Sequence, residues 1–154
     1  FYGLRNLKSL YLELNEISLI DLDAFESLES LILLSLAHNK LKTIEMSSLN
    51  RLISLIRLDL INNPLTILKN NSLNGLTRLK TLYLDQDRIE YLETEFLGPK
   101  NFNNLVKLTI NKNSLQKLKS GFFIHLYFLV HLELRENQIS IIESKTFSYL
   151  YSLE

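Results

Sequence analysis

The chain has 154 residues, enough for one domain with a buried core, and 46% of them are hydrophobic. Its 17 basic and 17 acidic side chains give a formal net charge of zero, with eight of each sign in residues 1–78 and nine of each in residues 79–154. This balance lacks the basic excess of a nucleic-acid or anionic-membrane binder, so we expect no nucleic-acid partner and no membrane contact by this segment. The chain contains no cysteine, which excludes disulfide frameworks and thiolate metal sites.

The first clear element lies at residues 7–20, which read "LKSLYLELNEISLI". Leu10 and Leu12 alternate with variable residues, and this alternation is the period of a strand that buries one face. Asn15 follows the strand, and Ile17 and Ile20 continue the apolar pattern. We therefore predict a short strand followed by an inward turn.

The same pattern returns along the whole chain at a spacing of 24 residues, except that the fourth copy has 26. Each copy begins with a leucine: Leu7, Leu31, Leu55, Leu79, Leu105 and Leu129. A bulky residue recurs at position 19 of each copy: Phe25, Leu49, Leu73, Leu97, Phe123 and Phe147. We predict six repeats, at residues 7–30, 31–54, 55–78, 79–104, 105–128 and 129–152, between the end of another repeat at 1–6 and the start of a further one at 153–154.

The fourth copy carries a two-residue insertion between Leu97 and Phe102, where Gly98 and Pro99 predict a longer surface loop. Polar terminal caps, which repeat arrays need for solubility, are missing from both ends of the chain. We therefore expect either an internal segment of a longer array or a product whose ends fray.

An asparagine follows the predicted strand in five of the six copies and an aspartate in the fourth, and this recurrence indicates a structural role. A side-chain amide both donates and accepts hydrogen bonds, so a column of these residues can pair with the turning backbone of successive repeats. An unpaired group there costs about 1–3 kcal/mol. The column comprises Asn15, Asn39, Asn63, Asp87, Asn113 and Asn137. Asp87 cannot donate when it is ionised, so we expect a local weakness or a compensating partner in the fourth repeat.

The spacing of leucines, asparagine and position 19 resembles the leucine-rich repeat family in its typical 24-residue form, the form of Toll-like receptor ectodomains and secreted repeat proteins. The resemblance covers the whole chain. It implies an α/β solenoid, a right-handed horseshoe-shaped superhelix with a concave parallel sheet and an irregular or short-helical convex side. The chain departs from the pattern in having leucine at 49, 73 and 97 and in lacking cysteine-rich caps.

The side chains at positions 3, 5, 7 and 8 of each repeat are expected to lie on the concave side and not in the core. They are therefore the candidates for contact with a ligand. The first four repeats mix apolar and aromatic residues with charge: Tyr11, Leu33, Arg57, Asp59, Ile61, Tyr83 and Asp85. Aromatic and arginine residues are typical anchors of protein interfaces. The later repeats are charged: Lys107, His131, Glu133 and Arg135. We expect all eleven to contact a protein ligand, although ion pairs that merely keep the sheet soluble are the alternative for the charged portion.

No pattern indicates catalysis, a metal site or a cofactor. His38 and His131 lie four predicted strands apart, and His131 beside Glu133 lacks a third ligand. The aromatic residues around His125 are expected to pack on the convex side. Asn70 begins an Asn-Asn-Ser acceptor motif for N-glycosylation on that same side.

Two functions remain open. The family resemblance favours the recognition portion of an extracellular or membrane-anchored receptor, or a secreted protein of adhesion or innate immunity. The alternative is a cytoplasmic repeat scaffold that recruits a protein partner to an enzyme or ligase elsewhere in the chain. We do not expect this segment to be an enzyme.

Overall fold

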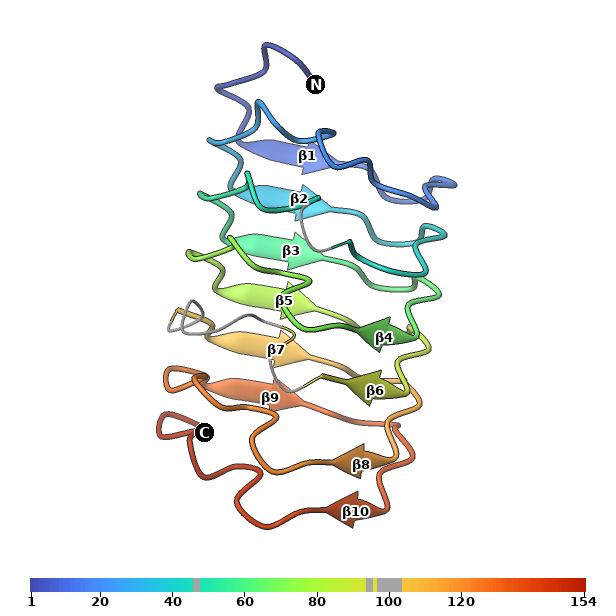
Figure 1. Cartoon of the computed structure of the whole chain (residues 1–154), viewed down its shortest axis with the longest axis vertical. Coiled ribbons are helices and arrows are strands. Elements are labelled where there is room, and N and C mark those ends of the chain that lie inside the picture. Colours follow the sequence, from blue (N-terminus) through green and yellow to red (C-terminus); the bar gives the residue numbers. More distant parts are fainter. Residues whose placement is uncertain (46–47, 94–95, 97–103) are drawn as a thin grey trace.

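The computed structural model describes residues 1–45, 48–93, 96 and 104–154, and they form a solenoid of stacked turns (Figure 1). Its front is a parallel sheet of six three-residue strands. In spatial order these are β1 (Ser9–Tyr11), β2 (Leu33–Ser35), β3 (Arg57–Asp59), β5 (Thr81–Tyr83), β7 (Lys107–Thr109) and β9 (His131–Glu133). The predicted leucine-rich solenoid with its parallel sheet is confirmed.

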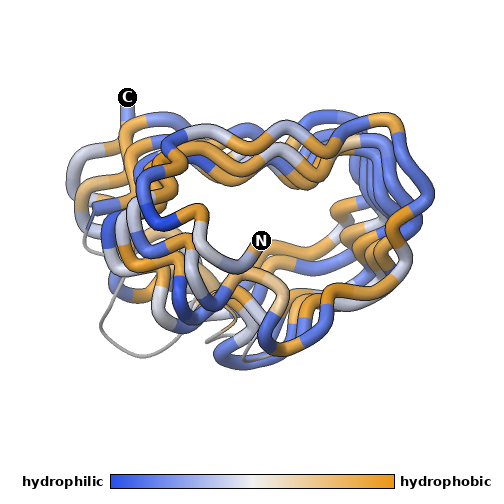
Figure 2. The backbone as a smooth tube through the Cα atoms, turned by 90° about the horizontal axis from the view of Figure 1, so that it is seen from above, coloured by the Kyte–Doolittle hydropathy of each residue, from blue (hydrophilic) through white to orange (hydrophobic). Residues whose placement is uncertain are grey.

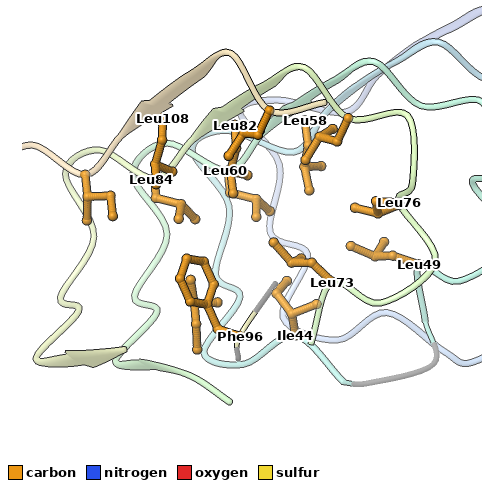
Figure 3. Packing of buried hydrophobic residues seen from close by; sticks show 14 of the residues in the cluster. Ile44, Leu49, Leu58, Leu60, Leu73, Leu76, Leu82, Leu84, Phe96 and Leu108 are labelled. Atoms are coloured by element: carbon orange, nitrogen blue, oxygen red, sulfur yellow. The ribbon is translucent and has the colours of Figure 1, made fainter. Parts of the chain in front are cut away.

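The register of the sheet follows from the leucine spacing. The middle residue of each strand pairs with the middle residue of the next, which aligns Leu10, Leu34, Leu58, Leu82, Leu108 and Leu132 in one row. These side chains point into the solenoid, where those of the four central strands are fully buried (Figure 3). Seen from above, the tube winds around this interior (Figure 2). One turn therefore supplies the apolar surface that its neighbours need in order to bury their own.

The back of the solenoid is irregular, with four two-residue strands. β4 (Ile67–Leu68) pairs in parallel with β6 (Tyr91–Leu92), and β8 (Lys117–Leu118) pairs with β10 (Ile141–Ile142). The described ranges contain no helix, so the short-helical form of the back is not found there. They also contain no helix long and apolar enough to cross a membrane.

The chain returns from back to front through two consecutive four-residue turns, which share one residue. In the third repeat, for example, Leu76 N–H donates to Leu73 O and Leu79 N–H donates to Leu76 O. The same pair of turns recurs at Phe25–Leu31, Leu49–Leu55, Phe123–Leu129 and Phe147–Leu153. Each turn satisfies a backbone donor, and its leucine is buried in all of these pairs except at the exposed Leu153, so a helix is not needed to close the repeat.

The fourth repeat keeps the register of its neighbours up to Phe96. Phe96 is 1% exposed in the core (Figure 3) and occupies position 18, which is also buried in other repeats, at Ser48, Ser72, Phe122 and Thr146. Its N–H donates to Glu93 O at 3.1 Å, as Ser72 N–H donates to Lys69 O at 3.1 Å in the third repeat. The predicted core residue Leu97 and the predicted loop at Gly98 and Pro99 lie outside the described residues.

Gly75 lies where two turns of the solenoid approach each other closely. Its φ is +97°, a conformation that side chains rarely adopt, and a Cβ on it would lie 2.8 Å from Asn50 O and 2.9 Å from Asn50 Cα. Gly121 also has a positive φ, +80°, but a Cβ there meets nothing within 4 Å. Substitutions at these two glycines can therefore distinguish the cost of backbone strain from the cost of steric contact between turns.

We expect Gly75→Ala to lower the free energy of unfolding by about 2–4 kcal/mol, because the left-handed strain adds to a contact with backbone that must shift. Gly121→Ala should lower it by only about 1 kcal/mol, since it adds strain alone. Urea unfolding of both variants makes the comparison. Equal losses would show that the turns are not tightly stacked at Gly75.

Candidate ligand-binding face

The outer face of the front sheet holds the predicted binding residues in two rows. The first residues of neighbouring strands pair across the sheet, which aligns Leu33, Arg57, Thr81, Lys107 and His131. The third residues align in the same way: Tyr11, Ser35, Asp59, Tyr83, Thr109 and Glu133. Ile61, Asp85 and Arg135 follow two residues after their strands. We call the eleven predicted residues on this side the sheet face.

Tyr83 lies at the centre of the sheet face between two cations. The Arg57 guanidinium carbon lies 4.7 Å from the centroid of the Tyr83 ring, and Lys107 Nζ lies 5.8 Å from it. Each cation also has a carboxylate partner, since Arg57 lies 3.5 Å from Asp59 and Lys107 lies 3.2 Å from Glu133. We call these five residues the Tyr83 cluster. They hold a ring and two cations in fixed positions on four adjacent strands.

The charged part of the sheet face is organised by Asn111, which connects three turns. Its Nδ2 donates to Glu133 at 3.1 Å, its Oδ1 accepts from Arg135 N–H at 2.7 Å, and its own N–H donates to Asp85 at 2.5 Å. The pKa of Glu133 is lowered by the hydrogen bond from Asn111 and then by that from Lys107, so Glu133 is ionised at neutral pH. The ion pairs expected of a solvated sheet are therefore present in this portion.

The remaining predicted residues stand outside these contacts. Tyr11 is 61% exposed at the β1 edge, Leu33 is half-buried on β2, and Ile61 is half-buried two residues after β3. His131 is exposed on β9 and shares no metal-binding group with other side chains in the part of the chain that the structure describes. The sheet face thus divides into an uncharged end at β1 to β2 and a charged network from β3 to β9.

The asparagine column lies directly behind the sheet face and ties successive turns together. Asn39 Oδ1 accepts from Ile17 N–H at 2.9 Å, and its Nδ2 donates to Leu12 O at 2.8 Å and to Leu36 O at 3.0 Å. Asn63, Asn113 and Asn137 repeat this arrangement with their own preceding turns. Asn15, on the first turn described, donates only to carbonyls of its own turn. The interpretation of the asparagines as structural agrees with these contacts.

Asp87 interrupts the column. Its Oδ1 accepts from Asn63 N–H at 2.5 Å, whereas the asparagines accept from a residue two positions further along the preceding turn. Its Oδ2 is buried without a hydrogen-bond partner and shares this condition only with Glu13 Oε2 among the described residues. Burial, together with the nearby Asp85 and Asp59 carboxylates, raises the pKa of Asp87 to about 8, against the opposing hydrogen bond from Asn63 N–H. The weakness expected in the fourth repeat is an orphaned carboxyl oxygen.

Sequence reasoning missed two features of this region. The residue before each column member has a left-handed backbone, with φ between 54° and 60°: Leu14, His38, Asn62, Gln86, Lys112 and Glu136. Only His38 and Asn62 are residue types enriched in this conformation, so the sequence gives little warning. Asn111 and Thr109, which hold Asp85 and Glu133, occupy outward positions in the pattern but were not predicted to organise the face.

We expect Asn113→Ala to lower the free energy of unfolding by about 1–3 kcal/mol, because it leaves the buried Ile89 N–H and Leu84 O without their amide partner. Gln116→Ala is the control, an exposed amide in the same repeat whose loss should cost less than about 0.5 kcal/mol. Chemical unfolding measures both. A loss at Asn113 no larger than at Gln116 would contradict a structural role for the column.

Comparisons with known proteins agree with this geometry. A family model described as leucine rich repeat matches residues 1–41, 31–89 and 103–154. Among solved structures, the crystal structure of the TLR13–ssRNA13 complex superposes with a TM-score of 0.92 at 33% sequence identity. The match covers 97% of this chain and 21% of that chain, so the segment spans about a fifth of its structural relative. No curated protein matches the sequence.

Proposed function

Since this chain belongs to the leucine-rich repeat family, we propose that it is a ligand-binding module that recognises a protein partner through the sheet face. The family and this fold are typically those of non-enzymatic binding modules. The observation that carries the proposal is the Tyr83 cluster, in which an aromatic ring and an arginine are already held in place at the centre of a broad sheet. Tyrosine and arginine are the residues in which binding energy concentrates, and groups fixed before binding lose little conformational entropy.

The uncharged end of the sheet face supports the same proposal. Apolar surface for a partner is offered there by Tyr11 on β1, by the half-buried Leu33 on β2 and by the exposed Leu14, three residues after β1. The charged network contributes less affinity than specificity, because exposed ion pairs are each worth about 0.2–1 kcal/mol. A protein ligand is therefore expected to place apolar groups over β1 and β2 and hydrogen-bonding groups over β3 to β9.

Single-stranded RNA is a second candidate partner. It is favoured by the similarity to TLR13, whose structure was determined with ssRNA13, and by the combination of cations with an aromatic ring at Tyr83. The formal charge of the chain is zero and both cations of the cluster have carboxylate partners, which favours the protein ligand. An RNA ligand and a protein ligand differ in the salt dependence of their affinity. Neutralising the phosphates of RNA releases counterions, so the affinity for RNA falls steeply as the salt concentration rises.

The likeness to TLR13 also supports an extracellular or membrane-anchored receptor setting, with the cytoplasmic scaffold as the alternative. A signal peptide or a membrane span encoded in the complete gene would support the first setting. Their absence from the gene would support the second.

We expect Arg57→Ala with Tyr83→Ala to weaken binding of a captured protein ligand by about 30-fold or more, because both interface anchors are removed. Lys119→Ala with Tyr91→Ala is the matched control, since Lys119 lies 4.4 Å from the Tyr91 ring on the back of the solenoid. Surface plasmon resonance at several salt concentrations, with a single-stranded RNA as second analyte, measures both. Unchanged affinity of a folded Arg57/Tyr83 variant would rule out the cluster as the binding site.

We propose that Asn70 carries an N-linked glycan if the protein is secreted. Asn70 is exposed in the turn after β4, on the back of the solenoid, where a glycan leaves the sheet face open. Secreted wild-type protein should lose mass on glycosidase treatment, and Asn70→Gln should remove that loss while Asn74→Gln retains it. Secreted wild-type material whose mass does not change would reject the site.

A further inference from the structure

Asp87 occupies a position in the column where a proton changes the number of hydrogen bonds that the side chain can make. It is 7% exposed, as buried as Asn39 two turns away. An ionised carboxylate accepts hydrogen bonds only, whereas a protonated carboxyl also donates one. The column residues face both backbone N–H groups, which their Oδ1 atoms accept from, and backbone carbonyls, which need a donor.

The hydrogen bonds of the neighbouring turns show which carbonyl the proton would serve. Leu12 O accepts from both Asn15 and Asn39, and Leu36 O accepts from both Asn39 and Asn63. Leu60 O accepts from Asn63 at 2.8 Å, and the second donor in this series would come from residue 87. The Asp87 oxygen that would carry the proton, Oδ2, is the one without a partner.

We propose that Asp87 makes the fourth turn a pH-responsive joint of the solenoid. The protonated carboxyl completes the column by donating to the Leu60 carbonyl. The ionised carboxylate leaves a buried charge facing carbonyl oxygens and loosens the contact between the third and fourth turns. This inference requires no ligand and holds whether or not the sheet face binds one.

The charged groups around Asp87 support the direction of the effect. Asp85 on its own turn and Asp59 at the end of β3 both disfavour its ionisation. Arg88, Lys40 and His38 line a groove with Asp87 along this edge of the sheet, and Lys40 is paired with Glu16 at 2.8 Å. On the fifth turn the nearest column member is the neutral Asn113.

The sign of the pH dependence follows from proton binding. The pKa of Asp87 is about 8 in the folded chain and near the ordinary value of 3.8 when unfolded, so between these values the folded state binds more protons. The stability contributed by the protonated carboxyl is therefore complete below pH 4 and is lost as the pH rises towards 8. Acidification tightens the fourth turn.

Hydrogen exchange of the full-length protein, read by mass spectrometry between pH 5 and 8 and corrected for intrinsic exchange, tests the proposal. Protection in peptides covering 60–68 and 84–92 should fall by at least about tenfold from pH 5 to pH 8, relative to a peptide covering 34–44. Asp87→Asn should abolish this difference, because its amide donates at every pH. His38→Gln should retain it, which separates the effect of the Asp87 carboxyl from that of the imidazole in the same groove.

Asn39→Asp provides the reciprocal variant, since it introduces a carboxyl at the same burial in the second turn. The pH dependence should then appear in the 34–44 peptide as well. Wild-type protection that does not depend on pH, or a pH dependence that persists in Asp87→Asn, would overturn the proposal. If Asp87→Asn does not fold, the appearance or absence of the new pH dependence in Asn39→Asp decides.

Discussion

The stacking of one turn on the next depends on side-chain amides. They form the hydrogen bonds that a neighbouring backbone strand would otherwise supply. After each strand of the front sheet the chain turns inward, and its N–H and C=O groups leave the ladder while still buried. The amides of Asn39, Asn63, Asn113 and Asn137 accept from the preceding turn and donate to carbonyls of two turns. The leucine core supplies most of the driving force, but it is non-directional. The column makes the spacing between turns specific, because only one register satisfies both sides of each amide.

The same stacking explains why the front of the molecule is suited to recognition. Strand residues alternate between core and solvent, so each added turn contributes outward side chains at fixed intervals without any cost to the core. In the Tyr83 cluster these side chains have combined into a network across four strands, in which each cation has both an aromatic and a carboxylate neighbour. The ion pairs of this network are already formed in the free protein, so its side chains are held in place. A partner then binds groups that need little reorganisation, which increases affinity.

Much of this architecture was predictable because it depends on spacing alone. The repeat of Leu10 every 24 residues was enough to predict the solenoid, the register and the buried row, since neighbouring turns must present equivalent residues to each other. Contacts that depend on local geometry were not predictable. Phe96 is buried at position 18, which the sequence pattern did not assign to the core, and the position of Arg57 over Tyr83 depends on rotamers across two strands. The orphaned oxygen of Asp87 was anticipated as a weakness, but the raised pKa needed the burial and the two neighbouring carboxylates.

The left-handed residues that precede the column have a consequence for engineering. All six are exposed, and none is β-branched, as expected of a conformation in which Val, Ile and Thr are strained. They form a line along one edge of the sheet at the strand-to-strand interval of about 4.8 Å. This edge therefore presents six side chains at a regular interval, and each of them can be substituted. A chosen sequence of amides, charges or glycines can be displayed there at atomic spacing, while the core and the asparagine amides behind it keep their places.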